Sequence, residues 1–368
     1  MSVTVRDLNI AIGGAPIVRG VDLDIADAQR VGLVGASGSG KSMISKAMLG
    51  LLPTHAVVSG SVVMGGMETV GTDDRRLADI RGRYAGMVFQ NPAASLNPVM
   101  SVEKQVGLPL RLHYDLTAVE RRERVRAMIR KVGLPDDVLG KFPHELSGGQ
   151  QQRVGIATAL ITSPRFIIAD EPTTALDSIT QRQIVRLLVS LVDDMGASLL
   201  FITHDFGVVA QIADKVAVMY AGRLLETGDV YDVFDRPAHP YTAGLLKTRP
   251  VIGRRVRRLY SLHDQFPDPD ELTDGSWSED NWDRIMADYQ SRHEQAIEQR
   301  DEVKSEWEHE THEAEEAQEQ TRRPIGCRPR PEPRPRAMRR PCWKCAISRS
   351  TSPRNAACSL RKPMSSRA

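Results

Sequence analysis

The chain has 368 residues, of which 41% are hydrophobic and 26% charged, and its formal net charge at pH 7 is only +2. This length is enough for two domains with a sizeable core, and so small a net charge does not indicate a nucleic-acid-binding protein. No apolar run approaches the ~20 residues that a membrane-spanning helix needs, and residues 1–6 alternate like a strand and lack the apolar stretch of a signal peptide. We therefore expect a soluble protein whose contact with any membrane is made through a partner.

Up to about residue 262, apolar runs of strand length alternate with longer amphipathic stretches, which is the pattern of a layered α/β domain. In chain order, this pattern predicts a buried strand at 31–34, a helix at 43–52, a charged helix at 116–132, and two further core strands at 166–169 and 198–202. Beyond this region the charges separate into blocks. Residues 264–320 carry 20 acidic against 4 basic side chains, and residues 321–368 carry 14 basic against one acidic. Such blocks are typical of solvated tails.

A glycine-rich string follows the first predicted core strand. Residues 35–42 read Gly-Ala-Ser-Gly-Ser-Gly-Lys-Ser, which has the GxxxxGK[ST] pattern of a phosphate-binding loop. Its glycines allow successive backbone N–H groups to face phosphate oxygens, and the helix that follows directs its positive end at the anion. Lys41 is expected to reach the β- and γ-phosphates and Ser42 to offer its hydroxyl to Mg²⁺. The predicted nucleotide-binding residues here are Gly35, Ala36, Ser37, Gly38, Ser39, Gly40, Lys41 and Ser42.

A later apolar strand, 166–169, ends in two adjacent carboxylates, Asp170 and Glu171. Asp170 is expected to hold the Mg²⁺ shell, directly or through water. Glu171 is expected to polarise the attacking water, as a general base or as a positioning group. A buried strand that ends in two solvated acids is common on its own, but the phosphate-binding loop upstream favours the catalytic interpretation.

The string Leu146-Ser147-Gly148-Gly149-Gln150 narrows the class further. Together with the phosphate-binding loop it resembles the ATP-hydrolysing subunits of ABC transporters. The resemblance implies an α/β P-loop NTPase core of ABC type, with an N-terminal antiparallel β layer and an inserted helical subdomain. It also implies that two subunits pair head-to-tail, with each ATP between one phosphate-binding loop and the partner's LSGGQ string. The residues expected to form this second phosphate surface, and the interface beside it, are Ser147, Gly148, Gly149, Gln150 and Asp177.

The same resemblance assigns roles to two further residues. Gln90 would contact Mg²⁺ and the attacking water and couple the site to membrane subunits, and His204, 33 residues beyond Glu171, would be the switch histidine that contacts the γ-phosphate. One element departs from the family pattern. Residues 9–14 lack the aromatic ring that commonly stacks on adenine, and Ile12 is the expected substitute. Its packing would lose the aromatic contribution of ~1 kcal/mol.

Three strings resemble one branch of the superfamily, the peptide-import ATPases of the D type. They are QNPAASLNP at 90–98, ADEPTTALD at 169–177, and HPYT at 239–242 followed by Leu245 and Leu246. The resemblance implies uptake of dipeptides, oligopeptides or nickel. It also implies a second, different ABC ATPase subunit, two integral membrane permease subunits, an extracytoplasmic solute-binding protein as an indirect partner, and no nucleic acid. The chain would lie peripherally on the cytoplasmic face of the inner membrane.

Two other functions stay open at this stage. One is a non-transport ABC ATPase that acts on ribosomes or DNA; such proteins typically carry two nucleotide domains or a long insertion, whereas this chain has one set of motifs. The other is a regulatory subunit that binds ATP without turnover, against which the intact Glu171 and His204 argue. The transported solute cannot be read from these residues.

The domain organisation expected from these motifs has three parts. Residues 1–250 form the ABC ATPase domain with a helical subdomain at about 91–160, residues 251–320 an acidic linker or helical insert, and residues 321–368 a basic tail. We favour a solvated helix for the acidic part, with folding back onto the basic tail as the alternative. The tail contains all four cysteines, Cys327, Cys342, Cys345 and Cys358. These could ligate an Fe–S cluster or zinc, but we favour an Arg/Pro-rich tail without metal.

Overall fold

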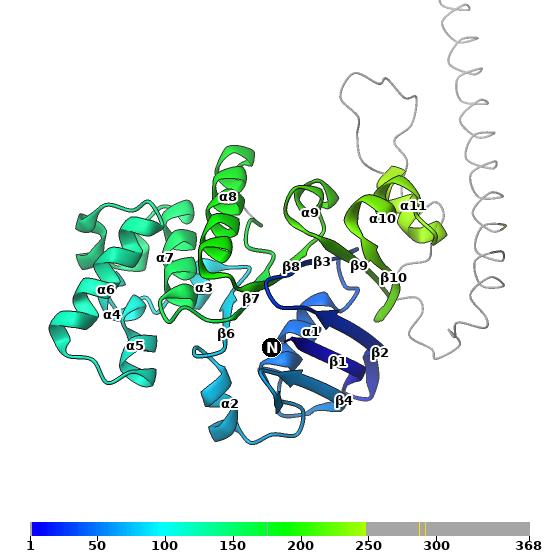
Figure 1. The fold of residues 1–368 in the computed structure, drawn as a ribbon, viewed down its shortest axis with the longest axis horizontal. Helices are drawn as coiled ribbons and strands as arrows, with labels where there is room; N and C mark the ends of the chain where they lie inside the picture. Colours follow the sequence, from blue (N-terminus) through cyan, green and yellow to red (C-terminus); the bar gives the residue numbers. More distant parts are fainter. Residues whose placement is uncertain (1, 175, 248–286, 288–290, 292–368) are drawn as a thin grey trace, which may run out of the picture. The chain divides into compact units, whose positions relative to one another are not determined.

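A computed structural model describes residues 2–174, 176–247, 287 and 291 (Figure 1). Contacts divide the chain into two compact units, Met1–Glu302 and Val303–Ala368, and all described residues belong to the first. The predicted domain boundaries at 250 and 320, the acidic and basic stretches, and the four cysteines lie outside the described residues. Among the described helices, none combines the length and the apolar character that crossing a bilayer requires.

A six-stranded sheet carries the core. Its strands are β3 (Arg30–Gly35), β6 (Ala85–Val88), β7 (Phe166–Asp170), β8 (Ser198–Thr203), β9 (Lys215–Tyr220) and β10 (Arg223–Asp229), in the order β10-β9-β3-β8-β7-β6. All neighbours are parallel except β9 and β10. Every residue of β7 and β8 is buried, as expected for parallel strands covered on both faces. The predicted strands at 31–34, 166–169 and 198–202 are therefore confirmed.

A second, antiparallel sheet forms the N-terminal layer. It consists of β1 (Val3–Ile12), β2 (Ala15–Ile25), β4 (Ala56–Met64) and β5 (Met67–Glu68), in the order β2-β1-β4-β5. Gly13 and Gly14 join β1 to β2 with φ of 58° and 85°, the left-handed conformations that a tight hairpin turn requires. Side chains of this layer and one face of β3, β7 and β8 share a hydrophobic cluster. The predicted antiparallel layer and the predicted α/β core are both confirmed.

Most helices lie beside or above the six-stranded sheet, and α1 (Lys41–Met48) lies between that sheet and the antiparallel layer (Figure 1). The helices are α1, α2 (Asp74–Ile80), α3 (Pro92–Ser95), α4 (Val102–Val106), α5 (Leu108–His113), α6 (Ala118–Lys131), α7 (Gly148–Leu160), α8 (Ser178–Met195), α9 (Phe206–Ile212), α10 (Val230–Asp235) and α11 (Pro240–Lys247), with 3-10 turns η1 (Asp136–Gly140) and η2 (Pro143–Glu145). Helices α3, α4 and α6 pack on α7. They form a helical cluster between β6 and β7 in the sequence, where the inserted subdomain was expected.

The charged helix predicted at 116–132 is α6. Thr117 caps it: its Oγ1 accepts from the Glu120 N–H, and the Glu120 carboxylate accepts from the Thr117 N–H at 2.9 Å. This reciprocal pair is a capping box. Val125, Met128 and Ile129 make the buried face, and the arginines of this helix are exposed except for the half-buried Arg121.

The helix predicted at 43–52 is shorter and begins earlier, since α1 spans Lys41–Met48. Gly50 ends it by adopting φ 60°. The Gly50 N–H donates to Ala47 O and the Leu51 N–H to Lys46 O at 2.7 Å. This left-handed termination satisfies the last carbonyls, and it overrides the apolar pattern that continues to Leu52.

Candidate active site

The phosphate-binding loop joins β3 to α1. Gly40 stands at its end with φ 99°, and a Cβ there would lie only 3.0 Å from the carbonyl oxygen of Ile17, so this position requires glycine. No side chain caps the start of α1. The first N–H groups of the helix are therefore available to an anion.

Lys41 is buried, with 5% of its surface exposed, beneath this loop. Its Nζ donates to Gly35 O at 3.0 Å, to Ala36 O at 2.7 Å and to Ser39 Oγ at 3.2 Å. Burial lowers the pKa of Lys41, and the charges of Glu171 and Asp170 oppose that shift. A cation held only by neutral oxygens gains from a phosphate anion, because the charge-assisted contact is the stronger one. These residues therefore fit the phosphates of ATP.

Asp170 and Ser42, two of the three predicted metal-binding residues, contact each other; the third is Gln90. The Ser42 hydroxyl donates to Asp170 Oδ1 at 2.8 Å. Asp170 is buried, and burial is the main cause that raises its pKa; the charge of Glu171 adds to it and the Ser42 hydrogen bond opposes it. One carboxylate, one hydroxyl and the phosphates of the substrate are ligands that suit Mg²⁺. Within the described residues, no group of three or more His, Cys, Asp or Glu side chains could hold a metal ion by itself.

Two predicted residues, Gln90 and His204, meet at the Glu171 carboxylate. Gln90 Nε2 donates to Glu171 Oε2 at 2.8 Å, and His204 Nδ1 lies 3.4 Å from Oε1. Gln90, Glu171 and His204 follow β6, β7 and β8, which are neighbours in the sheet. Because these strands are parallel, their carboxyl ends lie at one edge, which is where open α/β sheets bind ligands.

Two features of Glu171 were not foreseen. Its φ is 44°, a strained conformation for a residue with a side chain, of the kind that gathers at functional sites. Thr174 also donates its hydroxyl to Glu171 Oε2 at 2.9 Å. The sequence does place a hydroxyl residue, Thr174, three positions beyond Glu171. Only the geometry of the turn shows that this hydroxyl is directed back at the carboxylate.

The LSGGQ string lies at the start of α7. Ser147 Oγ accepts from the Gln150 N–H at 3.4 Å and Gln150 Oε1 accepts from the Ser147 N–H at 3.0 Å. Ser147 and Gly148 are exposed. In Figure 1, α7 lies with the helical cluster and α1 lies beyond β6 and β7, beside the N-terminal layer. The described side-chain hydrogen bonds of Ser147 and Gln150 are thus made to each other.

Asp177 caps α8. Its Oδ1 accepts from the N–H groups of Ile179 and Thr180, both at 3.0 Å. The hydrogen bonds from Thr180 are the main cause that lowers the pKa of Asp177, so this side chain is a carboxylate at neutral pH. Ile12, the expected adenine contact, ends β1 and is half-buried.

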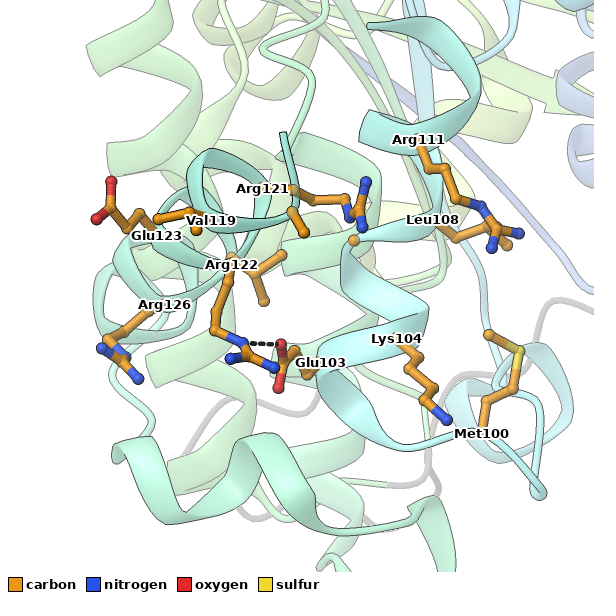
Figure 2. Close-up of a pocket in the computed structure, with 13 residues that line it drawn as sticks. Met100, Glu103, Lys104, Leu108, Arg111, Val119, Arg121, Arg122, Glu123 and Arg126 are labelled. Carbon is orange, nitrogen blue, oxygen red and sulfur yellow. Dashed lines mark hydrogen bonds and ion pairs between the residues drawn. The ribbon is translucent and has the colours of Figure 1, made fainter. Parts of the chain in front are cut away.

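A cavity of about 720 Å³ in the helical cluster is separate from these groups (Figure 2). It lies among α4, α5 and α6. Lys104, Arg111 and Arg121 line it, and Arg122 pairs across it with Glu103 at 2.7 Å. It shares no residue with the phosphate-binding loop or with the carboxylates. Its charge is a property of the helical cluster and not of the candidate active site.

Comparison with known proteins agrees with this geometry. Residues 18–174 match the ABC transporter family, and residues 225–276 match the oligopeptide/dipeptide transporter C-terminal region. A putative peptide import ATP-binding protein of Brucella abortus (strain 2308) is 43% identical over 273 residues, which cover 70% of this chain and 81% of the relative. The oligopeptide transport ATP-binding protein AppD of Bacillus subtilis (strain 168) is 40% identical over 264 residues, covering 71% and 80%.

A solved structure with a similar fold agrees with these family matches. The dimeric ATP-binding cassette MJ0796, in a post-hydrolysis state bound to ADP and Pi, has a TM-score of 0.56 and 31% identity; the match covers 62% of this chain and 98% of that one. Its fold, the family matches and the phosphate-binding loop above agree. The chain belongs to the ABC transporter ATP-binding proteins, a family of ATPases.

Proposed function

We propose that this protein is the ATP-hydrolysing subunit of an ABC importer for peptides or a related solute. The observation that carries the choice of solute class is the match of residues 225–276 to the oligopeptide/dipeptide transporter C-terminal region. The names of the relatives, peptide import and oligopeptide transport proteins, favour the same class. They favour transport over the alternative of an ABC ATPase that acts on ribosomes or DNA.

The hydrolytic step follows from the contacts of Glu171. Gln90 and Thr174 both donate to its Oε2, which leaves Oε1 to orient the attacking water or accept its proton. His204 faces this oxygen, and its side chain is 62% exposed against 16% for Glu171. It can therefore reach outward to the γ-phosphate of a bound nucleotide. Lys41 stabilises the negative charge that develops between the β- and γ-phosphates.

Mg²⁺, held at Ser42 and Asp170 with Gln90 beside it, would neutralise charge on the β- and γ-phosphates. The buried carboxylate of Asp170 and the hydroxyl that donates to it support this assignment. No other chemistry is required of the metal.

A second subunit completes the site in this proposal. Ser147 and Gly148 are exposed at the start of a helix, with the half-buried Gly149 beside them, and such a start binds phosphate. Asp177, at the neighbouring start of α8, belongs to the same surface. The dimeric state of the solved relative supports the pairing. ATP would join the two surfaces, and hydrolysis would remove the γ-phosphate that links them.

The contact with the membrane subunits is proposed at a cavity of about 320 Å³ beside Gln90. Leu51, Met87, Phe89 and Leu96 line it. Phe89 and Leu51 are 42% and 40% exposed, so apolar surface is open to a partner. An amphipathic helix fits such a groove. Two permease subunits and a second ATPase would place this chain on the cytoplasmic face of the membrane.

Recovery of the complex tests this function. The tagged chain, purified from its native membrane, should bring a second ATPase and two membrane proteins, and its Mg·ATP hydrolysis should rise with peptide. Phe89→Asp should lose the membrane proteins and keep ATP binding, whereas Val99→Asp, at an 80% exposed position outside the cavity, should keep both. Ribosomal or DNA-repair partners without membrane protein would leave the ATPase chemistry in place and overturn the transport function.

A further inference from the structure

The HPYT string begins α11, and local chemistry explains two of its four residues, His239 and Pro240. His239 Nδ1 accepts the N–H of Tyr241 at 3.1 Å. Pro240 is the first residue of the helix, where its missing N–H costs nothing. Thr242 is fully buried. Glu226 of β10 accepts from the N–H groups of Ala238 and His239 at 2.8 and 3.2 Å, which fixes the helix start on the sheet.

Tyr241 is the residue of this string that contacts the phosphate-binding loop. It is 1% exposed, and its ring lies on that of Tyr220, with centroids 4.4 Å apart. Its hydroxyl accepts from the N–H of Ala36, 205 residues away, at 3.4 Å. Burial raises the pKa of Tyr241, so the hydroxyl stays neutral beside a site for phosphate. A polar group of the C-terminal element thus contacts the phosphate-binding loop directly.

The contacted peptide unit is the one that also holds Lys41. The Gly35–Ala36 peptide donates its N–H to Tyr241, and its carbonyl, Gly35 O, accepts from Lys41 Nζ at 3.0 Å. Ala36 O accepts from the same Nζ at 2.7 Å. Tyr241 and Lys41 therefore hold opposite sides of one peptide plane. Rotation of that peptide plane would move the carbonyl oxygens that accept hydrogen bonds from Lys41 Nζ.

The turn between β9 and β10 supports the loop from a second side. The Gly222 N–H donates to Ser39 O at 3.1 Å, and a Cβ on Gly35 would lie 2.1 Å from Met219 O. Tyr220, on which Tyr241 packs, is the last residue of β9. The C-terminal element thus touches the loop through Tyr241 and also rests on the strand that supports the loop.

We propose that Tyr241 is a positioning residue of the phosphate-binding loop, through which α11 sets the affinity of the site for ATP. It touches neither substrate nor reacting atoms; it orients the Gly35–Ala36 peptide and with it Lys41. This inference rests on the proposed function of the loop as the ATP site. The proposal gives α11 a role in nucleotide binding.

Tyr241→Phe in the full-length chain removes the hydroxyl and keeps the ring. The dissociation constant and KM for ATP should rise by about threefold to tenfold, the effect of one lost hydrogen bond. At saturating ATP, kcat should fall by less than the affinity does, because Gln90, Glu171 and His204 are unchanged and only the orientation of Lys41 is affected. Amide exchange at Ala36 should become faster in the nucleotide-free variant, since its N–H loses the acceptor.

Tyr231→Phe is the matched control, because Tyr231 lies on α10 and is 74% exposed. It should change neither affinity nor exchange. A Tyr241→Phe protein with a lower melting temperature but unchanged ATP affinity and unchanged Ala36 exchange would make Tyr241 a core residue only and overturn the proposal. Lys41→Ala tests the site separately, since unchanged ATP binding there would overturn the loop assignment itself.

Discussion

Two phosphate surfaces of this chain differ in how complete they are. At the start of α1, the loop already holds its cation: Lys41 is buried and three oxygens contact it. At the start of α7, Ser147 and Gly148 are exposed, and Ser147 contacts only its own helix turn among the hydrogen bonds described. Both are helix starts that favour anions. Among the described residues, only the surface at the start of α1 has its charged side chain already held in place by the same chain.

The difference separates two properties of the protein. In the proposed function, affinity for ATP depends on Lys41 and its loop, so it belongs to the single chain. Turnover needs the second surface as well, which a neighbouring subunit supplies in the proposed function. Variants at the two surfaces should therefore change different measurements.

The largest effect is expected at Glu171. Glu171→Gln keeps the hydrogen-bonding shape but removes the charge that polarises water, so kcat should fall by about 10²- to 10⁴-fold. ATP should still bind, and the closed dimer should accumulate in size-exclusion chromatography. Glu123→Gln, on α6 away from the site, should hydrolyse normally. Near-normal turnover in Glu171→Gln would remove Glu171 from its proposed role.

Ser147→Ala tests the exposed surface. It should leave ATP binding to the single chain unchanged and lower turnover of the assembled complex by about tenfold or more, because a hydrogen bond to a charged phosphate is lost. Thr117→Ala is the matched control, since Thr117 caps α6 with the same capping box and should cost about the same helix stability. If both variants slow turnover equally, the loss is one of helix stability, and Ser147 is not a phosphate contact.

Burial of the Asp170 carboxylate should also lower the free energy of unfolding, by an amount that depends on pH. The raised pKa of Asp170 means that the folded chain binds a proton more readily than the unfolded chain. Stability of the nucleotide-free protein therefore falls as pH rises from the ordinary carboxyl value of 3.8 through the raised one.

Asp170→Asn should remove that cost. The melting temperature should rise by about 2–4 °C for each kcal/mol relieved, with the gain present near about pH 8 and lost as pH falls through the raised pKa. Asp232→Asn, an exposed carboxylate paired with Arg236, should show no such trend. A gain that is constant with pH, or a loss at every pH, would contradict the stated cause.

Much of this arrangement could be predicted from the chain because its signals are local. The strands at 166–169 and 198–202 are short apolar runs that the sheet buries on both faces. Gln90 and His204 were assigned by resemblance, and the structure brings both to Glu171. The end of α1 was wrong by four residues, although Gly50 is a local stop signal that competes with the apolar pattern.

The contacts that were missed depend on distance along the chain or on turn geometry. Thr174 reaches Glu171 because its own N–H closes a turn onto Glu171 O at 3.2 Å. Tyr241 reaches Ala36 only after the whole sheet has formed between them. No periodicity relates residues 205 positions apart, so a positioning contact of this kind is visible only in the fold.

The smallest effect is expected from removing the chain beyond residue 262. All contacts described for both phosphate surfaces lie before residue 248. A chain ending at 262 should therefore keep the ATP dissociation constant, with a stability change within about 0.5 kcal/mol. A chain ending at 238 loses Tyr241 and Leu245, both buried, and should bind ATP more weakly and melt earlier. If the chain ending at 262 aggregates or loses ATP binding, as the chain ending at 238 should, then the segment beyond 262 packs on the core. The boundary predicted near residue 250 would then be wrong.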